Sequence, residues 1–174
     1  FIAGDHCRLT LFGGKLRRAA LFKPAQVVAD GRSTLAELIK IENAKRAEAV
    51  AAHLRGADAV VFAAGAGPGS GAARKETVDR DAAILLADAA QQAGVRRYVM
   101  ISAMGADPEA PDGTGDPVFA AYLRAKGAAD NDIRAREGLD ATIVRPGLLT
   151  DDPGTGLVTA AERTGRDSIP RDDV

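Results

Sequence analysis

Two side chains that could move a proton together stand four residues apart, in the segment Tyr122-Leu-Arg-Ala-Lys126. On a helix, side chains at positions i and i+4 share one face. A phenol has an unperturbed pKa of about 10, and a neighbouring ammonium favours the phenolate, which brings that pKa towards neutral pH. The pair therefore predicts an acid/base site, in which Lys126 could also donate to sugar hydroxyls. The alternative is a surface tyrosine packed along a lysine stem.

The elements expected to position this pair alternate along the chain. Short apolar runs alternate with alanine-rich stretches of helical periodicity, which is typical of a parallel sheet covered by helices. We expect helices over residues 33–55, 72–93 and 118–137, the first capped by Ser33 and each of the others closed by a glycine. The expected strands are Phe1–Ala3, Ala20–Phe22, Val27–Ala29, Ala59–Ala64, Tyr98–Ser102 and Ala141–Arg145.

Ser102 is a third candidate for the same site. It ends the fifth expected strand, and the helix that carries Tyr122 and Lys126 is the next element along the chain. Open α/β sheets bind ligands at the carboxyl ends of their strands. We therefore expect Ser102 near the Tyr–Lys pair, the alternative being a strand-end hydroxyl that is bonded to backbone. Residues 105–117, rich in Gly, Pro and Asp, form the expected loop between them.

Five ordered segments after residue 55 carry a family resemblance: Gly56–Gly65, Val78–Ala90, Ala93–Ser102, Tyr122–Lys126 and Val144–Gly147. As a set they resemble the atypical short-chain dehydrogenase/reductase superfamily, with its NmrA-like, NAD-dependent epimerase/dehydratase-like and flavin-reductase-like NAD(P)-binding members. The resemblance implies a Rossmann-type α/β fold, with a doubly wound parallel sheet in the order 3-2-1-4-5-6 between two helical layers. It also implies a single NAD(P)-binding domain over residues 1–174.

The resemblance assigns roles to individual residues. Tyr122 matches the proton-transferring tyrosine, and Lys126 matches the lysine that holds the nicotinamide ribose and lowers the phenol pKa. Ser102 is the third catalytic candidate, although relatives place their polarising Ser or Thr one or two residues later, where this chain has Ala103 and Met104. Residues expected to contact the cofactor are Gly4, Lys23, Asp30, Ala63, Ala64, Gly65, Ser102, Tyr122, Lys126, Pro146 and Gly147.

The N-terminal segment departs from the family pattern. After a strand we expect Gly-x-x-Gly-x-x-Gly, but Gly4 is followed at the next two glycine positions by Cys7 and Thr10. Residues 5–55 are therefore irregular, and the ending Ile169–Val174 reads as the start of a helix, so that a truncated C-terminus is expected. Lys23 stands where relatives meet the 2′-phosphate, which favours NADP(H) over NAD(H).

Composition narrows the remaining function classes. The 174 residues carry 23 basic and 24 acidic side chains, which gives no general reason to expect a nucleic acid partner. One cysteine (Cys7) and two histidines (His6 and His53) exclude a disulfide framework and a Cys/His zinc site, and the longest apolar run is far too short for a membrane span. We expect a cytoplasmic monomer or homodimer that binds a small-molecule substrate.

Three hypotheses follow. The first is an NADP(H)-dependent oxidoreductase or epimerase-like protein that transfers hydride to a small carbonyl, flavin or quinone-like substrate. The second is a non-catalytic NADP(H)-sensing module, which the residues Ala103 and Met104 favour. The third is the same fold without nucleotide binding, which the altered glycine loop favours.

Overall fold

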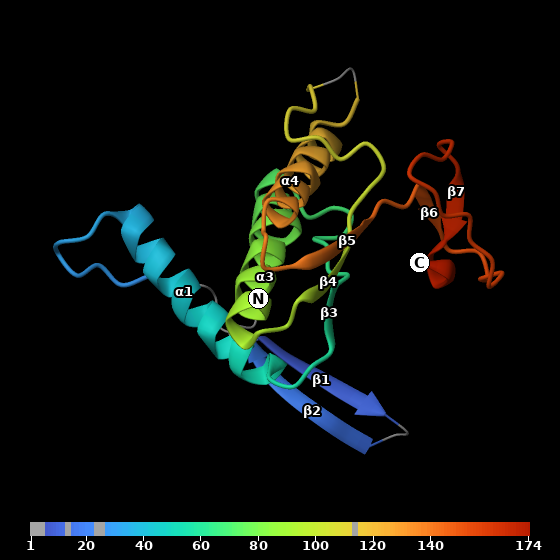
Figure 1. Cartoon of the computed structure of the whole chain (residues 1–174). Coiled ribbons are helices and arrows are strands. Elements are labelled where there is room, and N and C mark those ends of the chain that lie inside the picture. The colour runs from blue at the N-terminus through green and yellow to red at the C-terminus, as the bar shows by residue number, and fades with distance from the viewer. Residues whose placement is uncertain (1–5, 13–14, 23–26, 113–114) are drawn as a thin grey trace. The chain divides into compact units, whose positions relative to one another are not determined.

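The computed structural model describes residues 6–12, 15–22, 27–112 and 115–174, and it divides at Glu42 into two compact units. The first unit covers residues 1–42 and the second covers residues 43–174. Figure 1 shows the elements of both units in chain order. Each unit is described by itself below.

The first unit contains a β-hairpin where a parallel strand–helix–strand unit is expected. Strands β1 (His6–Phe12) and β2 (Lys15–Phe22) pair antiparallel, with His6 opposite Phe22 and a register shift between Thr10 and Leu11. The prediction of Ala20–Phe22 as a parallel strand was therefore wrong in its pairing. The overlooked signal is Gly13-Gly14 between two apolar runs, a pair of residues that is typical of hairpins.

Residues 27–30 form no strand, which corrects the predicted strand Val27–Ala29. Instead Asp30 organises a turn, because its Oδ1 accepts hydrogen bonds from the backbone N–H groups of Arg32 and Ser33 at 2.9 and 2.7 Å. Such an Asx turn competes with strand pairing. The predicted strand Phe1–Ala3 and the residues Gly4 and Lys23 lie outside the described residues.

Helix α1 (Leu35–Leu54) confirms the long helix expected over residues 33–55, with the cap one residue later than predicted. Thr34 Oγ1 accepts from the N–H of Glu37 at 3.3 Å, and the Glu37 carboxylate accepts from the N–H of Thr34 at 2.7 Å. This reciprocal pair is a capping box. In the second unit, Ala47 and Ala51 pack against Ala89.

The second unit is built on a parallel sheet in the order β3-β4-β5, from Ala59–Phe62, Arg97–Ile101 and Asp140–Val144. Val60 pairs with Tyr98, and Tyr98 pairs with Ala141. These strands correspond to the last three of the predicted order, and the α/β fold class is confirmed. The first three strands of that order have no counterpart among the described residues, because β1 and β2 form a hairpin.

Two long helices pack against this sheet and against each other. They are α3 (Ala82–Ala93) and α4 (Pro117–Arg134). Their small side chains allow close approach: Ala83, Ala87 and Ala129 are fully buried in the same core as Tyr98 and Met100. The Tyr98 hydroxyl donates to the Ala83 carbonyl at 2.9 Å, which satisfies the one polar group that this ring brings into the core.

The helix expected over residues 72–93 is interrupted in its first half. It consists of α2 (Ala72–Lys75), the π-helical turn η1 (Glu76–Asp81) and α3, which ends at Gly94 in the left-handed conformation (φ 75°). A π turn inserts one extra residue per turn and often marks a functional site. Here it contains Asp79, which is completely buried.

The chain continues beyond the three-stranded sheet into a small two-stranded one. Strands β6 (Leu148–Thr150) and β7 (Ser168–Pro170) pair in parallel, and the 3₁₀ turn η2 (Arg171–Asp173) follows. The sequence reading predicted neither strand, because each has only three residues. It expected a helix start where β7 and η2 stand.

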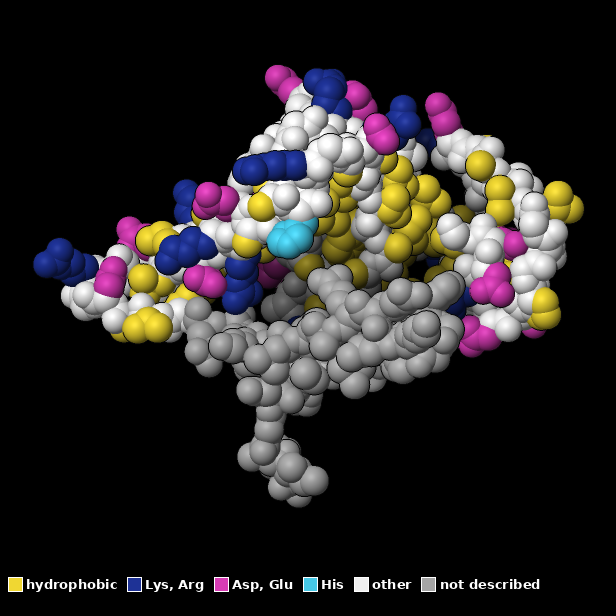
Figure 2. Space-filling view, turned by 90° about the horizontal axis from the view of Figure 1, so that it is seen from below, with side chains coloured by type: hydrophobic (Ala, Val, Ile, Leu, Met, Phe, Trp, Pro, Cys, Tyr) yellow, Lys and Arg dark blue, Asp and Glu magenta, His cyan; other side chains and the backbone are white. Residues whose placement is uncertain are grey.

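Two features of the described residues concern membrane spans and metal sites. None of the helices found there is both long enough and apolar enough to cross a membrane. No group of three or more His, Cys, Asp or Glu in these ranges could hold a metal ion. On the face seen in Figure 2, basic and acidic side chains are interspersed.

Candidate functional site

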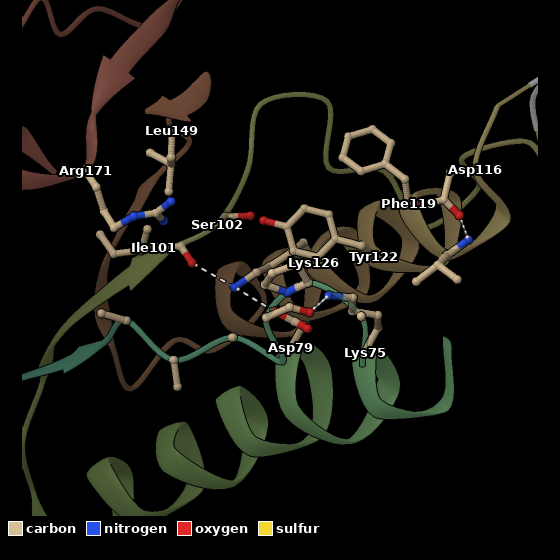
Figure 3. A pocket seen from close by; sticks show the side chains of 17 residues that line it. Lys75, Asp79, Ile101, Ser102, Asp116, Phe119, Tyr122, Lys126, Leu149 and Arg171 are labelled. Atoms are coloured by element: carbon tan, nitrogen blue, oxygen red, sulfur yellow. Dashed lines mark hydrogen bonds and ion pairs between the residues drawn. The ribbon is translucent and has the colours of Figure 1, made fainter. Parts of the chain in front are cut away.

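A cavity of about 550 Å³ lies where β3 and β4 end. Its wall contains the residues after β3, the last residue of β4, the π turn η1 and one face of α4, which Figure 3 shows from close by. The lining residues are Ala63, Ala64, Gly65, Gly67, Pro68, Gly69, Lys75, Asp79, Ile101, Ser102, Asp116, Val118, Phe119, Tyr122, Lys126, Leu149 and Arg171. The structure thus brings six of the predicted site residues together: Ala63, Ala64, Gly65, Ser102, Tyr122 and Lys126.

Helix α4 places Tyr122 and Lys126 on the face that lines this cavity. The N-terminus of the helix is capped by Asp116, whose side chain accepts from the N–H of Val118 at 2.8 Å, and Pro117 occupies the first turn. Lys126 is only 3% exposed, and its Nζ donates to the Ile101 carbonyl at 2.9 Å. Tyr122 is half-buried. The surface-pair alternative for Tyr122 and Lys126 is therefore wrong.

Asp79 is the counter-ion of Lys126. The Asp79 Oδ1 and Lys126 Nζ atoms lie 3.5 Å apart, and both side chains are nearly inaccessible to solvent. The other oxygen, Oδ2, accepts from the N–H of Ala66 at 3.3 Å. A Cβ on Gly65 would lie 3.2 Å from Asp79 Oδ1, so a glycine permits this close approach. One buried carboxylate therefore ties the loop after β3 to the lysine of α4.

The effect of Lys126 on the Tyr122 phenol differs from the sequence prediction. Burial raises the pKa of Tyr122, and the negative charges of Asp79 and Asp130 raise it further. Burial also lowers the pKa of Lys126, against the opposing effect of Asp79. The direction of the Tyr122 pKa shift is thus set by burial and by these two carboxylates, not by the Lys126 ammonium. In this arrangement the phenol holds its proton at neutral pH, as a proton donor requires.

Ser102 contributes a hydroxyl that has no partner. The residue is 3% exposed, and its Oγ has no hydrogen-bond partner among the described residues. Figure 3 shows the hydroxyl ends of Ser102 and Tyr122 directed towards one another. The alternative of a hydroxyl bonded to backbone is therefore wrong. A buried hydroxyl without a partner costs stability. The unused donor and acceptor of Ser102 Oγ are therefore available for a hydrogen bond to a ligand.

Lys75 is a site residue that the sequence reading missed. It is 8% exposed, its Nζ donates to the Gly67 carbonyl at 2.7 Å, and this Nζ lies 5.3 Å from the centre of the Tyr122 ring. A lysine in an alanine-rich helix gives no sequence signal of burial. Its role depends on the short helix α2, which holds it beneath the glycine-rich loop.

Pro146 and Gly147 line a second cavity of about 580 Å³, which shares Phe119, Tyr122 and Leu149 with the first. Gly147 must be glycine here, because a Cβ would collide with the carbonyl oxygen of Asp167. That carbonyl accepts from the N–H of Leu148 at 3.1 Å. The turn after β5 is thereby held against the segment that leads into β7.

The remaining predicted contacts, Asp30, Gly4 and Lys23, lie outside the described part of the second unit. Asp30 belongs to the first unit, where its turn holds the carboxylate and lowers its pKa to about 2. Gly4 and Lys23 lie outside the described residues. His53 lies on α1, with its Nδ1 2.8 Å from the Ala49 carbonyl oxygen.

The second unit offers groups that suit one half of a nicotinamide dinucleotide. The buried Ser102 Oγ is unpartnered, and the ammonium groups of Lys75 and Lys126 line the same cavity. Such donors match the hydroxyls of a ribose and the amide of a nicotinamide. The residues present therefore fit the nicotinamide-ribose half of the cofactor.

Comparisons with known proteins identify the family of this chain. The sequence profile described as NAD(P)H-binding matches residues 15–174. The Bacillus subtilis protein YhfK, named as an uncharacterized sugar epimerase, is 40% identical over 127 residues, which are 73% of this chain and 58% of YhfK.

Two solved structures are also similar. A Bacillus halodurans protein, named as a candidate NAD-dependent epimerase/dehydratase, has a TM-score of 0.59 at 38% identity over 71% of this chain and 56% of that one. The Lactococcus lactis oxidoreductase ylbE has a TM-score of 0.59 at 30% identity, over 73% and 57% of the two chains. This chain thus spans less than three fifths of the length of each of these relatives.

Proposed function

Since this chain belongs to the NAD(P)H-binding family, we propose that it is a nicotinamide-dependent oxidoreductase or epimerase-like protein acting on a small carbonyl, flavin or quinone-like substrate. The observation that carries the proposal is the meeting of Ser102, Tyr122 and Lys126 at one cavity, beside the strand-end residues Ala63–Gly65. A nicotinamide cofactor supplies or accepts a hydride when bound.

Tyr122 is the proposed acid/base. Its raised pKa keeps the phenol protonated, so it can give a proton to a carbonyl oxygen as the carbonyl carbon is reduced. Ser102 supports the same oxygen by donating from its unpartnered hydroxyl. The two donors act on one atom, which would fix the orientation of the substrate.

Lys126 is the proposed holder of the nicotinamide ribose, through its ammonium protons. Its stem is fixed by burial and its head by the Ile101 carbonyl and Asp79, so the ammonium is pre-positioned. Asp79 acts through Lys126 as a positioning residue. Ala63, Ala64, Gly65, Pro146 and Gly147 would contact the cofactor with their backbones or small side chains.

Replacement of Tyr122 by Phe tests the catalytic proposal. Loss of the phenolic hydroxyl should lower turnover of carbonyl substrates at least about 100-fold, because the proton donor is gone. Cofactor affinity, measured by calorimetry, should stay within about threefold, because the ring still packs in the cavity. Asn131→Ala, which alters an exposed side chain of the same helix that lines neither cavity, is the matched control. Unchanged turnover in Tyr122→Phe would contradict the proposal.

The second candidate function is a non-catalytic sensor of NADP(H). The presence of Ala103 and Met104 where relatives carry a polarising Ser or Thr favours it. Calorimetry with NADPH and NADH, together with a turnover assay, separates the two: nucleotide binding without turnover of any carbonyl would favour the sensor. The preference for NADP(H), which depends on Lys23, remains a prediction that the same titrations test.

A further inference from the structure

The second cavity is mainly apolar but carries one unpaired charge. Its lining includes Met104, Phe119, Pro146, Leu148 and Leu149, which suit a flat or hydrocarbon-rich molecule. Tyr122 lies in its wall as well as in the wall of the first cavity. A molecule in the second cavity would therefore reach the proposed proton donor.

The charged side chains that line the two cavities are engaged, with one exception. Lys75 donates to Gly67, Asp79 pairs with Lys126, Asp116 accepts from Val118, Arg171 pairs with Asp151, and Asp167 accepts from Ser168. Arg166 has neither a hydrogen bond nor an ion pair within the described parts of the chain. Its guanidinium is also exposed, so its donors are open to a ligand.

Arg166 lies beside the loop after β4. A Cβ on Gly105 would lie 3.3 Å from Arg166 Nη2, so the guanidinium is close to that glycine. Gly105 has φ +84°, a conformation in which a side chain would be strained. The guanidinium thus extends from the segment before β7 towards the β4 loop, at the rim of the apolar cavity.

We infer that the substrate of the second cavity combines an apolar body next to its reacting carbonyl with an anionic oxygen group, a carboxylate or a phosphate, that Arg166 binds. This inference rests on the proposed function, because the ligand of the second cavity is a substrate only if the chain is an enzyme. The planar guanidinium offers paired donors that match the oxygens of either anion. Asp167 lines the same cavity, so the anionic group is expected on the Arg166 side of the rim, away from that carboxylate.

Binding of matched probes to the full chain tests this inference without using turnover. FMN and riboflavin differ by a phosphate, and 4-carboxybenzaldehyde and 4-methylbenzaldehyde differ by a carboxylate. We expect the anionic member of at least one pair to bind about fivefold to tenfold more tightly, by flavin fluorescence or calorimetry. The pair that shows the preference identifies whether the anion is a phosphate or a carboxylate.

Arg166→Gln should abolish this preference while leaving the affinity for the neutral probe within about twofold. Arg163→Gln, which removes an exposed arginine of the same segment that lines neither cavity, should leave the preference intact. The preference should also weaken between 50 mM and 500 mM salt, because an exposed ion pair is screened.

The inference is overturned if neither anionic probe binds more tightly than its neutral counterpart, or if Arg166→Gln and Arg163→Gln behave alike. Failure of the proposed function gives a different result. In that case the anion preference persists in the unaltered chain while no carbonyl compound is turned over with NADPH or NADH. Tyr122→Phe separates the two claims in the same way. It should lose turnover, because the proton donor is removed, and it should keep the anion preference, because Arg166 stays in place.

Discussion

The cavities have two walls, which are built in different ways. The packed wall, formed by the ends of β3 and β4 with α2, η1 and α4, holds Lys75, Asp79, Ser102 and Lys126, each no more than 8% exposed. The outer wall, formed by residues 148–174, leaves Leu148 and Leu157 73% and 81% exposed. The packed wall holds its polar groups buried, whereas the outer wall presents the exposed Arg166. The proposed chemistry accordingly lies on the packed wall and the proposed substrate recognition on the outer wall.

Among the variants that compare the two walls, Asp79→Asn is expected to lower the free energy of unfolding most. Removing the carboxylate leaves the Lys126 ammonium buried without a counter-ion, which should cost about 3 kcal/mol of unfolding free energy. Asp88→Asn, at a carboxylate whose side chain is 45% exposed and pairs with Arg136, should cost less than about 1 kcal/mol, because solvent screens it. Denaturant unfolding of both variants measures the difference, and equal losses would contradict a special role for the buried pair.

The same variant has a pH signature. Asp79 raises the pKa of Lys126 against the effect of burial, so its loss lowers that pKa further. Lys126 should then lose its proton at a lower pH, and the alkaline limb of kcat/KM should move to lower pH. An alkaline limb that stays in place would show that Lys126 does not act as a cation in the reaction.

The second largest effect is expected from Gly127→Ala in α4. A Cβ at this position would collide with the backbone of Asp107 and Pro108, so the loop must move away from the helix. Overpacking of this kind should cost about 2 kcal/mol, in spite of the better helix propensity of alanine. Gly165→Ala on the outer wall has open space around its Cβ and should change stability by less than about 0.5 kcal/mol.

Ser102→Ala should separate stability from chemistry. Its hydroxyl has no partner to lose, so the free energy of unfolding should stay the same or rise slightly. Turnover of carbonyl substrates should fall about tenfold, because one donor to the carbonyl oxygen is removed. A stability loss above about 1 kcal/mol with turnover intact would assign Ser102 to the structure instead.

The smallest effect is expected on the outer wall itself. Leu157→Ser exchanges a side chain that is 81% exposed and should change stability by less than about 0.5 kcal/mol. Leu139→Ser, at a core position that is 8% exposed, should cost about 2 kcal/mol or more. Thermal unfolding of the pair measures the contrast, and a loss at Leu157 as large as at Leu139 would mean that the outer wall is packed too.

The packed wall could largely be predicted from the sequence, whereas the outer wall could not. The packed wall could be predicted, because β3 to β5 are continuous apolar runs, α3 and α4 end near glycines, and Tyr122 and Lys126 have helical spacing. The burial of Lys75 could not be predicted, because it depends on the contact of α2 with the Gly67 carbonyl, and a lysine in an alanine-rich helix gives no sequence signal of burial. The sequence prediction of a lowered Tyr122 pKa was wrong. Burial and the charge of Asp79 raise this pKa, and both arise from tertiary packing of residues that are distant in the sequence.

The N-terminal hairpin and the outer wall were the least predictable regions. The family pattern predicted a parallel strand–helix–strand unit in this region. The pair Gly13-Gly14, which is typical of a β-hairpin turn, was given less weight. Strands β6 and β7 have three residues each, which is too short for a periodicity to appear. Their pairing depends on the contact of Gly147 with Asp167, 20 residues away in the chain.

The most direct test of the central claim is transfer of a labelled hydride. The full chain is incubated with 4-deuterated NADPH or NADH, in both C4 configurations, and with 4-carboxybenzaldehyde, whose alcohol product keeps the transferred deuterium on carbon, and the product is examined by mass spectrometry. The account predicts deuterium on the product carbonyl carbon from one C4 configuration only, and at least about 100-fold slower labelling in Tyr122→Phe. Nucleotide binding without label in any product, or equal labelling by Tyr122→Phe, would contradict the account.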